Sequence, residues 1–223
     1  MSPRGQTRID ANGRTAASTA DAPTRSSRRD ELLATAGRMF AEQGLRSTTV
    51  RDIADAAGIL SGSLYHHFDS KESMVDEILR GFLDDLFARY RQIAASSKSA
   101  TETLRGLVIA SFESIDAERN AVAIYQDEAK RLSGQERFAY ISELNVEFRQ
   151  LWQSVLQRGV ENGEFRADLD VELVYRFMRD TVWVAVRWYR PGGSMTVDSI
   201  ADQYLSVVLD GILPRRPRAS KLG

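Results

Sequence analysis

One short segment, residues 49–71, gathers hydroxyl, imidazole and ammonium groups that can donate hydrogen bonds to phosphates or to the edges of bases. Its sequence is TVRDIADAAGILSGSLYHHFDSK, which reads as a short helix, a tight turn at Gly58 and a second short helix. Gly58 supplies the positive φ that a tight turn favours. This pattern is typical of a helix-turn-helix, whose second helix enters the major groove of DNA. We therefore predict that this segment binds DNA.

The second helix of the motif carries most of the candidate DNA-binding residues. Tyr65 and His66 lie one turn beyond Ser61 and Gly62, on the side away from the buried Leu64. Gly62 has no side chain at a point where the helix must approach DNA closely, although glycine costs roughly 1 kcal/mol within a helix. The predicted DNA-binding residues are Thr49, Arg51, Ser61, Gly62, Ser63, Tyr65, His66 and Lys71.

Two basic residues and two histidines of this segment admit more than one interpretation. Arg51 is the stronger candidate for a base or phosphate contact, because arginine reads guanine through two hydrogen bonds. Lys71 either holds a phosphate or is a surface lysine at the start of the next helix. His66 and His67 are adjacent, so their side chains diverge by about 100° on a helix, which suits one metal ion poorly. We predict neither a metal site nor a cofactor.

Hydrophobic periodicity predicts helices on both sides of the motif. Residues 29–43 repeat apolar side chains at i, i+3, i+4 and i+7. Thr49 is a suitable N-cap, with Asp52 placed to complete a capping box. The second helix of the motif is expected over residues 61–68. Further helices are expected over residues 71–95, 101–117, 121–132, 137–162, 171–189 and 197–213. No convincing strand pattern interrupts them, so the predicted fold class is all-α.

The chain is expected to hold two folded parts and two tails. Residues 28–75 are predicted to form a three-helix DNA-binding domain, and residues 76–213 a helical domain for ligand binding and dimerisation. Six arginines against two aspartates give residues 1–29 a charge of +4, within a total of −1. The arm over residues 1–27 is therefore either an aid to phosphate attraction or only a disordered leader. Residues 214–223 are expected to form a basic tail.

Composition excludes several classes of protein. Hydrophobic residues make up 43% and charged residues 27%, which suits a folded protein. The absence of cysteine excludes disulfides, thiolate zinc sites and cysteine nucleophiles. No apolar run is long enough to span a membrane and no signal peptide is evident, so we expect a cytoplasmic protein without a membrane partner. The phosphate-binding and catalytic motifs GxxxxGK[ST], GxGxxG, GxSxG and HExxH are absent, and we predict no enzyme activity.

A second informative segment, residues 171–190, places Arg176, Arg179, Trp183 and Arg187 at steps of three, four and four. On one continuous helix these side chains would form a single stripe. Arginine is costly to bury on so apolar a helix unless an anion pairs with it. Two interpretations remain open. The arginines either meet carboxylates across a dimer interface, where Arg and Trp are enriched, or bind a phosphate-bearing ligand whose adenine packs on the indole.

Other aromatic residues of the C-terminal part either line an apolar pocket or belong to an ordinary helical core. Tyr125 is followed by Gln126, in a polar group that could meet the oxygen atoms of a ligand. The predicted ligand-binding residues are Tyr125, Gln126, Trp152, Arg176, Arg179, Trp183 and Arg187.

The motif resembles the DNA-binding signature of the TetR family of bacterial repressors, through Ala57-Gly58-Ile59, Gly62, Leu64-Tyr65, His67-Phe68 and Lys71-Glu72. This resemblance implies a homodimer that binds a palindromic double-stranded operator and is released by a small-molecule inducer. One position departs from the pattern. Leu60 lies where the family usually has Ser or Thr, which would cap the helix and touch phosphate. Ser61 or Ser63 would have to take over that role.

Three longer stretches resemble a group of these repressors that controls bacterial cholesterol catabolism. They are GILSGSLYHHF, IYQDEAKRL at residues 124–132, and VYRFMRDTVWVAVRWYRPGG at residues 174–193. The inducer that this resemblance implies is a coenzyme A thioester of a late steroid-ring fragment, which favours a ligand for the Arg/Trp stripe. The alternative is a repressor of another regulon, concerned with fatty acyl-CoA or drug efflux, with a purely apolar inducer.

Overall fold

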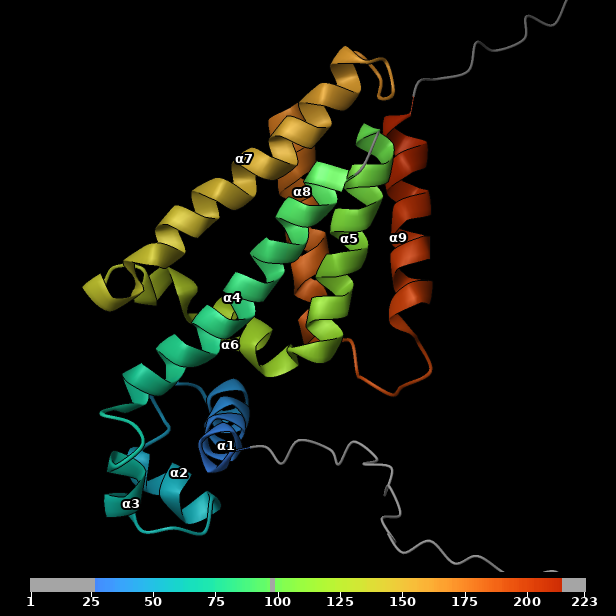
Figure 1. Ribbon diagram of the computed structural model, residues 1–223. Helices are drawn as coiled ribbons and strands as arrows, with labels where there is room; N and C mark the ends of the chain where they lie inside the picture. The colour runs from blue at the N-terminus through green and yellow to red at the C-terminus, as the bar shows by residue number, and fades with distance from the viewer. Residues whose placement is uncertain (1–26, 97–98, 214–223) are drawn as a thin grey trace, which may run out of the picture.

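A computed structural model of the chain describes residues 27–96 and 99–213, and within these ranges the fold is entirely helical, as predicted (Figure 1). The predicted basic tail and the predicted arm, apart from Ser27, lie outside the described residues. The helices in chain order are α1 (Arg28–Gln43), α2 (Val50–Ala56), α3 (Ser61–Tyr65), α4 (Lys71–Ser96), α5 (Ala100–Ala117), α6 (Arg119–Leu132), η1 (Glu136–Phe138), α7 (Ala139–Glu161), α8 (Val171–Val184), η2 (Ala185–Arg187) and α9 (Val197–Ile212).

Local capping explains where several helices begin. The Thr49 hydroxyl accepts from the Asp52 N–H at 3.2 Å, and the Thr49 N–H donates to the Asp52 carboxylate at 2.9 Å. This is the predicted capping box, which satisfies two N–H groups that the first turn leaves unpaired. The hydrogen bonds from Thr49 also lower the pKa of Asp52. Ser27 and Asp30 form the same arrangement at the start of α1.

Two predicted helix ends were wrong, and a third predicted helix is divided in two. The helix expected over residues 61–68 ends at Tyr65, and the helix expected over 137–162 is divided into η1 and α7. The helix expected over 171–189 leaves α geometry after Val184 and continues as the 3-10 turn η2. Val186 and Tyr189 beyond that break are still buried, so the apolar pattern continues where the α-helix does not. Arg187 therefore does not share one α-helical stripe with the arginines of α8.

The N-terminal domain packs α1, α2 and α3 around a small apolar core at one end of the molecule (Figure 1). Leu32 of α1, Ile53 of α2 and Leu64 of α3 are buried in it. Arg29 joins this unit to the next helix, because its guanidinium lies 4.4 Å from the centre of the Phe68 ring and pairs with Glu77.

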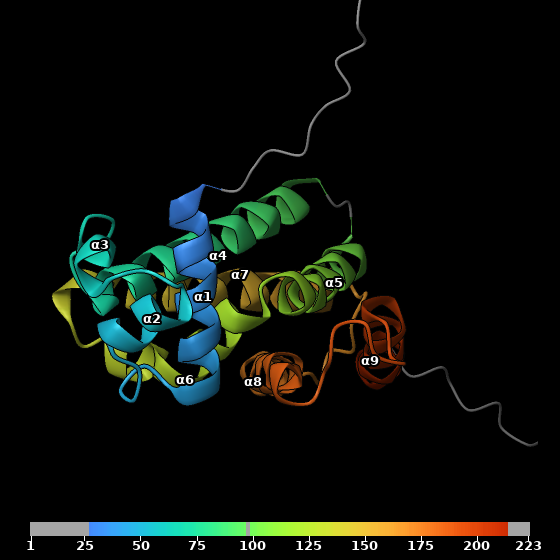
Figure 2. The same cartoon turned by 90° about the horizontal axis from the view of Figure 1, so that it is seen from below.

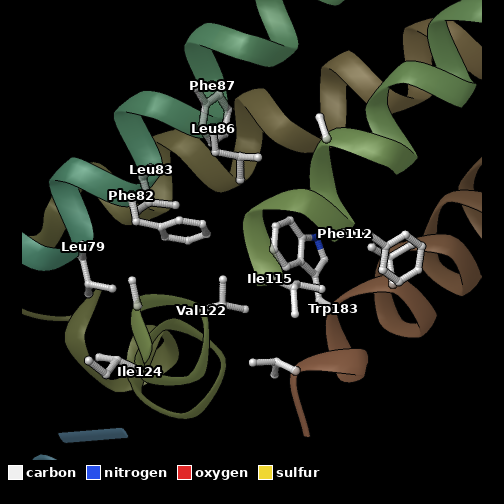
Figure 3. Packing of buried hydrophobic residues seen from close by; sticks show 14 of the residues in the cluster. Leu79, Phe82, Leu83, Leu86, Phe87, Phe112, Ile115, Val122, Ile124 and Trp183 are labelled. Atoms are coloured by element: carbon white, nitrogen blue, oxygen red, sulfur yellow. The ribbon is translucent and has the colours of Figure 1, made fainter. Parts of the chain in front are cut away.

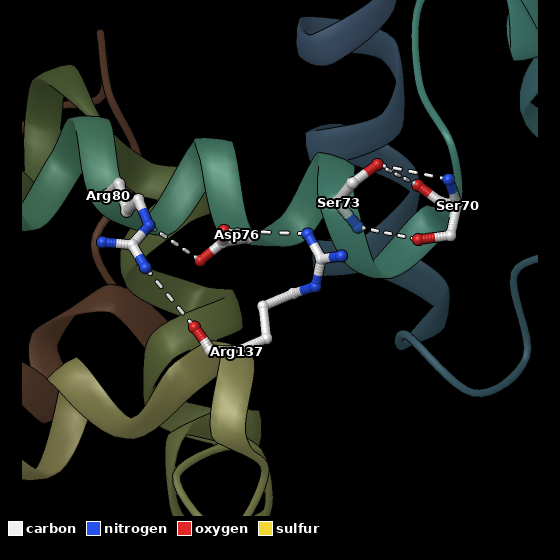
Figure 4. Close-up of polar contacts among 5 residues, drawn as sticks. All are labelled: Ser70, Ser73, Asp76, Arg80 and Arg137. Carbon is white, nitrogen blue, oxygen red and sulfur yellow. Dashed lines mark hydrogen bonds and ion pairs between the residues drawn. The ribbon is translucent and has the colours of Figure 1, made fainter.

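Helix α4 runs without a break from the N-terminal domain into the C-terminal one, so the predicted division at residue 75 falls inside a helix. Its first turns are held by polar contacts (Figure 4). Ser70 and Ser73 exchange hydrogen bonds at 3.1 and 3.2 Å. Asp76 accepts from Arg80 at 3.0 Å and lies 3.9 Å from the guanidinium of Arg137, which precedes α7. The contacts with Arg137 fasten α4 to the C-terminal domain beside its junction with the N-terminal domain.

The C-terminal domain is a bundle in which α5 contacts α4, α7, α8 and α9. Figures 1 and 2 place α9 at the outer edge of this bundle, and Figure 2 shows α8 and α9 on the same side of it. The apolar side chains of α4, α5, α6 and α8 converge in the interior (Figure 3). In the part of the chain that the structure describes, none of the helices is long and apolar enough to cross a membrane.

Candidate nucleic-acid interface and ligand cavity

The segment from α2 to α3 has the geometry of a helix-turn-helix. Gly58 has a φ of +68°, as the turn requires, and the Ile59 N–H closes the turn by donating to the Ala54 carbonyl at 3.0 Å. Ile53 and Leu64 face the core, which leaves the opposite side of both helices to solvent. The predicted DNA-binding residues come from that side and from its edges.

Several of these side chains are free to meet a partner. The side chain of Arg51 is 84% exposed and has only a loose approach of 3.8 Å to Asp55. Tyr65 is 55% exposed. Among the described residues, no hydrogen bond or ion pair engages the side chains of Ser61, Ser63, Tyr65 or His66. Their donors are therefore available to phosphates or base edges without breaking an internal contact.

Lys71 and Thr49 already have structural roles. The Lys71 ammonium donates to the carbonyls of Leu45 at 2.7 Å and Thr48 at 3.0 Å, and so holds the connection between α1 and α2. One of its three N–H groups is left for the predicted phosphate contact. The Thr49 hydroxyl is engaged in the cap of α2. Both residues position the motif in the free protein, whatever they touch in a complex.

Gly62 is a helical residue that internal packing does not require. A Cβ added at this position would meet nothing within 4 Å, and the backbone is not in the left-handed region. Glycine here costs helix stability relative to alanine without improving any contact inside the protein. Close approach of DNA to the backbone of α3 would explain why glycine occupies this position, as the sequence predicts.

Gly62→Ala is therefore expected to raise the stability of the fold and to lower its affinity for the operator. The free energy of unfolding of the variant should be about 0.5 to 1 kcal/mol higher than that of the native protein, because alanine is the better helix former. Its operator affinity should fall about tenfold or more, the size of one lost base contact. Thermal melting and fluorescence anisotropy on a labelled duplex measure the two effects.

Gly81→Ala is the matched control for this prediction. Gly81 is also an exposed glycine within a helix, and a Cβ there also meets nothing within 4 Å. It lies on α4, away from the motif, so it should stabilise similarly and leave operator affinity unchanged. Equal operator binding by both variants would contradict the close approach at Gly62.

A second candidate site is a cavity of about 710 Å³ in the C-terminal domain. Residues of α4, α6, α7 and α8 line it, with Ser133 just beyond the end of α6. The lining residues are Phe82, Leu83, Leu86, Phe87, Tyr125, Gln126, Ala129, Lys130, Ser133, Asn145, Val146, Phe148, Arg149, Tyr175, Arg179, Asp180 and Trp183. Its size lies in the ordinary range for small-molecule sites.

One wall of this cavity is aromatic and aliphatic. Phe82 of α4 points toward Trp183 of α8 (Figure 3), with ring centres 6.2 Å apart and the rings nearly perpendicular. Phe148 of α7 lies 6.3 Å from the same indole. Such edge-to-face pairs are a favourable arrangement for aromatic rings. This wall is suited to a rigid apolar group.

Polar and cationic groups also line the cavity. The Tyr125 hydroxyl donates to the Asn145 side chain, and burial raises the pKa of Tyr125 to about 12, which keeps the phenol neutral. Arg179 donates to Asp180 at 2.7 Å, and its guanidinium lies 5.7 Å from the Tyr175 ring centre. The hydrogen bond to Asp180 raises the pKa of Arg179.

Two further cations border the cavity, Lys130 and Arg149. Arg149 pairs with Glu172 at 2.8 Å, and Lys130 is exposed. Among the lining residues three side chains are cationic and one, Asp180, is anionic. Arg149 and Arg179 thus each have a carboxylate partner, whereas Lys130 has no ion pair among the described residues. The cavity combines an apolar wall with one unpaired cation and two paired arginines, which suits an amphipathic anion.

The structure brings together four of the seven predicted ligand-binding residues, namely Tyr125, Gln126, Arg179 and Trp183. Trp152 is only 1% exposed and stacks behind Phe148, with ring centres 5.6 Å apart. Arg176 lies outside the cavity, paired with Glu172 at 2.6 Å.

Arg187 borders a different cavity, of about 390 Å³, between α1, α6 and η2. It lies 3.5 Å from Asp127 there. Sequence reasoning missed the α4 wall, Asn145 and Arg149. The apolar repeat of α4 does not distinguish a cavity wall from a solid core. Tyr175 could have been found, because it lies four residues before Arg179 and so shares its face of the helix.

A third feature is an apolar groove of about 840 Å³ between α8 and α9. Large hydrophobic side chains remain exposed along it, including Phe177 at 61% and Val207 at 65%. A contiguous apolar surface of this kind marks an interaction site rather than an ordinary surface.

Comparison with known protein families agrees with this architecture. Residues 32–78 match the family described as bacterial regulatory proteins, tetR family, and residues 97–212 match the tetracyclin repressor-like C-terminal domain. The chain belongs to the TetR family of bacterial transcriptional regulators, which confirms the resemblance seen in the helix-turn-helix.

Individual relatives narrow the class further. The chain is 69% identical to the HTH-type transcriptional repressor KstR2 of Rhodococcus jostii, over 86% of this chain and 94% of the relative. It is 63% identical to KstR2 of Mycobacterium tuberculosis, over 83% and 93%. The solved structure of the ketosteroid transcriptional regulator KstR2 of M. tuberculosis superimposes with a TM-score of 0.84 at 62% identity, covering 85% of this chain and 97% of the other. The protein is thus a transcriptional repressor of the TetR type, similar to a solved relative described as a ketosteroid transcriptional regulator. These relatives are named as transcriptional repressors or regulators, not as enzymes.

Proposed function

We propose that this protein is a homodimeric repressor that leaves a palindromic operator when it binds a coenzyme A thioester of a steroid-ring fragment. The observation that carries the proposal is the cavity between α4, α6, α7 and α8, whose lining combines aromatic rings with cationic side chains. A fused-ring acyl group is apolar and rigid, whereas coenzyme A carries several phosphate charges. The ring system would contact the aromatic lining of the cavity, and the phosphates would contact its cationic side chains.

The cationic side suits the phosphates of such a ligand. The planar guanidinium of Arg179 presents a fork of N–H donors, of which one is engaged by Asp180. Arginine binds phosphate through paired, charge-assisted hydrogen bonds. Lys130 adds a charge nearby that has no ion pair among the described residues, whereas Arg149 is paired with Glu172. A ligand that delivers negative charge to this place gains more than a neutral one does.

The relatives favour a steroid-derived ligand over the alternatives. The solved relative is described as a ketosteroid regulator, and it is 62% identical to this chain. A repressor of another regulon with a purely apolar inducer would need no cationic side chains beside the aromatic wall. A fatty acyl thioester carries the same phosphates, so it is the relative described as a ketosteroid regulator that places the steroid-derived thioester ahead of it.

A second copy of the chain is the proposed occupant of the groove between α8 and α9. The apolar side chains of this groove are exposed in the single chain. Pairing of α8 and α9 with the same helices of a second copy, about a two-fold axis, would bury them in a four-helix interface. One recognition helix reads too few bases for useful specificity, so two are needed. The half-sites should lie about 34 to 36 Å apart, or a multiple of that distance.

Release from DNA would follow from a shift between two populations of the dimer. The ligand need only bind better to a form whose two α3 helices are wrongly spaced for the half-sites. Helix α4 is suited to transmit this change, since its apolar side chains line the cavity and its first turn holds the connection between α1 and α2 through Lys71.

A mobility-shift titration tests the proposal. The duplex is taken from the region upstream of the protein's own gene, and the added compounds are a ring-fragment thioester, its free acid, coenzyme A and palmitoyl-coenzyme A. We expect the ring-fragment thioester alone to release the duplex at low concentration, because the other compounds each lack the rigid ring or the phosphates. Release by palmitoyl-coenzyme A at equal concentration would refute the steroid-derived inducer, and failure to bind the duplex would refute the repressor.

A further inference from the structure

Leu60 is an exposed leucine at the start of the recognition helix. It precedes Ser61, the first residue of α3, and 79% of its surface is open to solvent. In the described part of the DNA-binding domain, Leu60 and Tyr65 are the large hydrophobic side chains that remain mostly exposed. Leu60 precedes the five-residue helix α3, and Tyr65 is its last residue. The other exposed large hydrophobic residues belong to the C-terminal domain.

The fold does not explain this leucine. Leu60 occupies the N-cap position of α3, and no side-chain hydrogen bond caps the helix there. Ser, Thr, Asp or Asn at an N-cap would satisfy a free N–H group of the first turn, which leucine does not do. With so much of its surface in solvent, the side chain also contributes little to the core. This position thus lacks a cap and exposes an apolar group, and neither property stabilises the protein.

We infer that Leu60 reads a thymine in the operator through contact with its 5-methyl group. The thymine methyl is the apolar group that base pairs present in the major groove, and aliphatic side chains recognise it by direct contact. The first residues of a recognition helix are the ones that reach base edges. Leu60 adjoins Ser61 and Gly62 at that end, where the missing side chain of Gly62 permits close approach. The inference rests on operator binding by α3.

A test compares thymine with deoxyuridine, which differs only by the methyl group. An operator duplex is selected by the native protein from random sequences, and each thymine is replaced in turn by deoxyuridine. Each half-site should contain one thymine whose single replacement lowers the affinity of the native protein about fourfold, the effect of one buried methyl group. Replacement in both half-sites should cost about fifteenfold, since the two contacts are equivalent. Fluorescence anisotropy at fixed salt gives the affinities.

The variant Leu60→Ser supplies the second half of the test. It should bind the deoxyuridine and thymine duplexes equally, and it should melt at or above the native temperature because serine restores a cap. Leu60→Met is the matched control, which keeps an apolar side chain and should keep the preference for thymine. Retention of the full deoxyuridine effect by Leu60→Ser would overturn the inference.

Three further outcomes also bear on the inference. Equal binding of every thymine and deoxyuridine duplex by the native protein would refute the methyl contact while leaving operator binding in place. Loss of affinity in Leu60→Ser with the same deoxyuridine effect as the native protein would assign Leu60 to the sugar-phosphate backbone instead. Failure of the native protein to select any duplex would refute the operator binding on which the inference depends.

Discussion

Replacing both Tyr65 and His66 with alanine is expected to lower operator affinity on the order of a thousandfold. The two side chains are exposed at the end of α3 and have no partner within the described protein. A dimer would lose two contacts in each half-site, and each hydrogen bond contributes roughly 1 kcal/mol. Folding should change by no more than about 0.5 kcal/mol, because both residues lie on the surface. Mobility shift, circular dichroism and sedimentation velocity measure binding, helix content and assembly.

Tyr65→Phe separates the hydroxyl group from the ring in the same experiment. If the hydroxyl donates to DNA in both half-sites, this single change should cost roughly tenfold to a hundredfold in affinity. Native affinity in Tyr65→Phe would assign the contact to the ring. Native affinity in the double variant at the same salt concentration would show that α3 is not the recognition helix.

The recognition motif was predictable from sequence because its determinants are local. The capping box of Thr49 and Asp52 and the positive φ of Gly58 each depend on neighbours a few residues away, and the structure has both. The end of α3 was less predictable. Phe68 is buried like Leu64, so the apolar spacing continues for a turn after the helix itself has ended at Tyr65.

The candidate ligand site was predictable only in part, because a cavity is formed by segments distant in the chain. Arg179 and Trp183 were found by their spacing on one helix, and both line the cavity. The same reasoning grouped Arg187 with them, but the change to a 3-10 turn after Val184 carries Arg187 to Asp127 and a different cavity. A break of this kind has no signature in hydrophobic periodicity, since the buried positions continue through it.

Lys71 shows how tertiary contacts change the role of a residue within a recognised motif. Its charge and place in the motif predicted a phosphate contact. The structure shows two of its donors engaged by the carbonyls of Leu45 and Thr48, 26 and 23 residues away in the chain. Those acceptors lie in the connection between α1 and α2, and only the folded chain brings them to Lys71. The phosphate contact by the remaining N–H group stays a prediction.

The double variant Arg179→Met and Trp183→Leu is expected to give constitutive repression. Both substitutions keep apolar bulk but remove the charge and the indole that face the cavity. Loss of charge-assisted hydrogen bonds, at roughly 1.5 to 3 kcal/mol, and of an aromatic contact should weaken inducer binding about a hundredfold to a thousandfold. Operator affinity should stay within about twofold of native, because neither residue is near α3. Calorimetric titration with the thioester and a mobility shift with and without it measure the two quantities.

Arg176→Met is the matched control for this double variant. Arg176 lies on α8 one turn before Arg179, but it is paired with Glu172 outside the cavity, so its loss should leave the response to the thioester intact. If Arg179 and Trp183 instead hold two protomers together, the double variant should sediment as a monomer and lose operator binding, since two half-sites require a dimer. A dimeric variant that still responds to the thioester would exclude both roles, because neither the ligand nor the partner would then depend on these side chains.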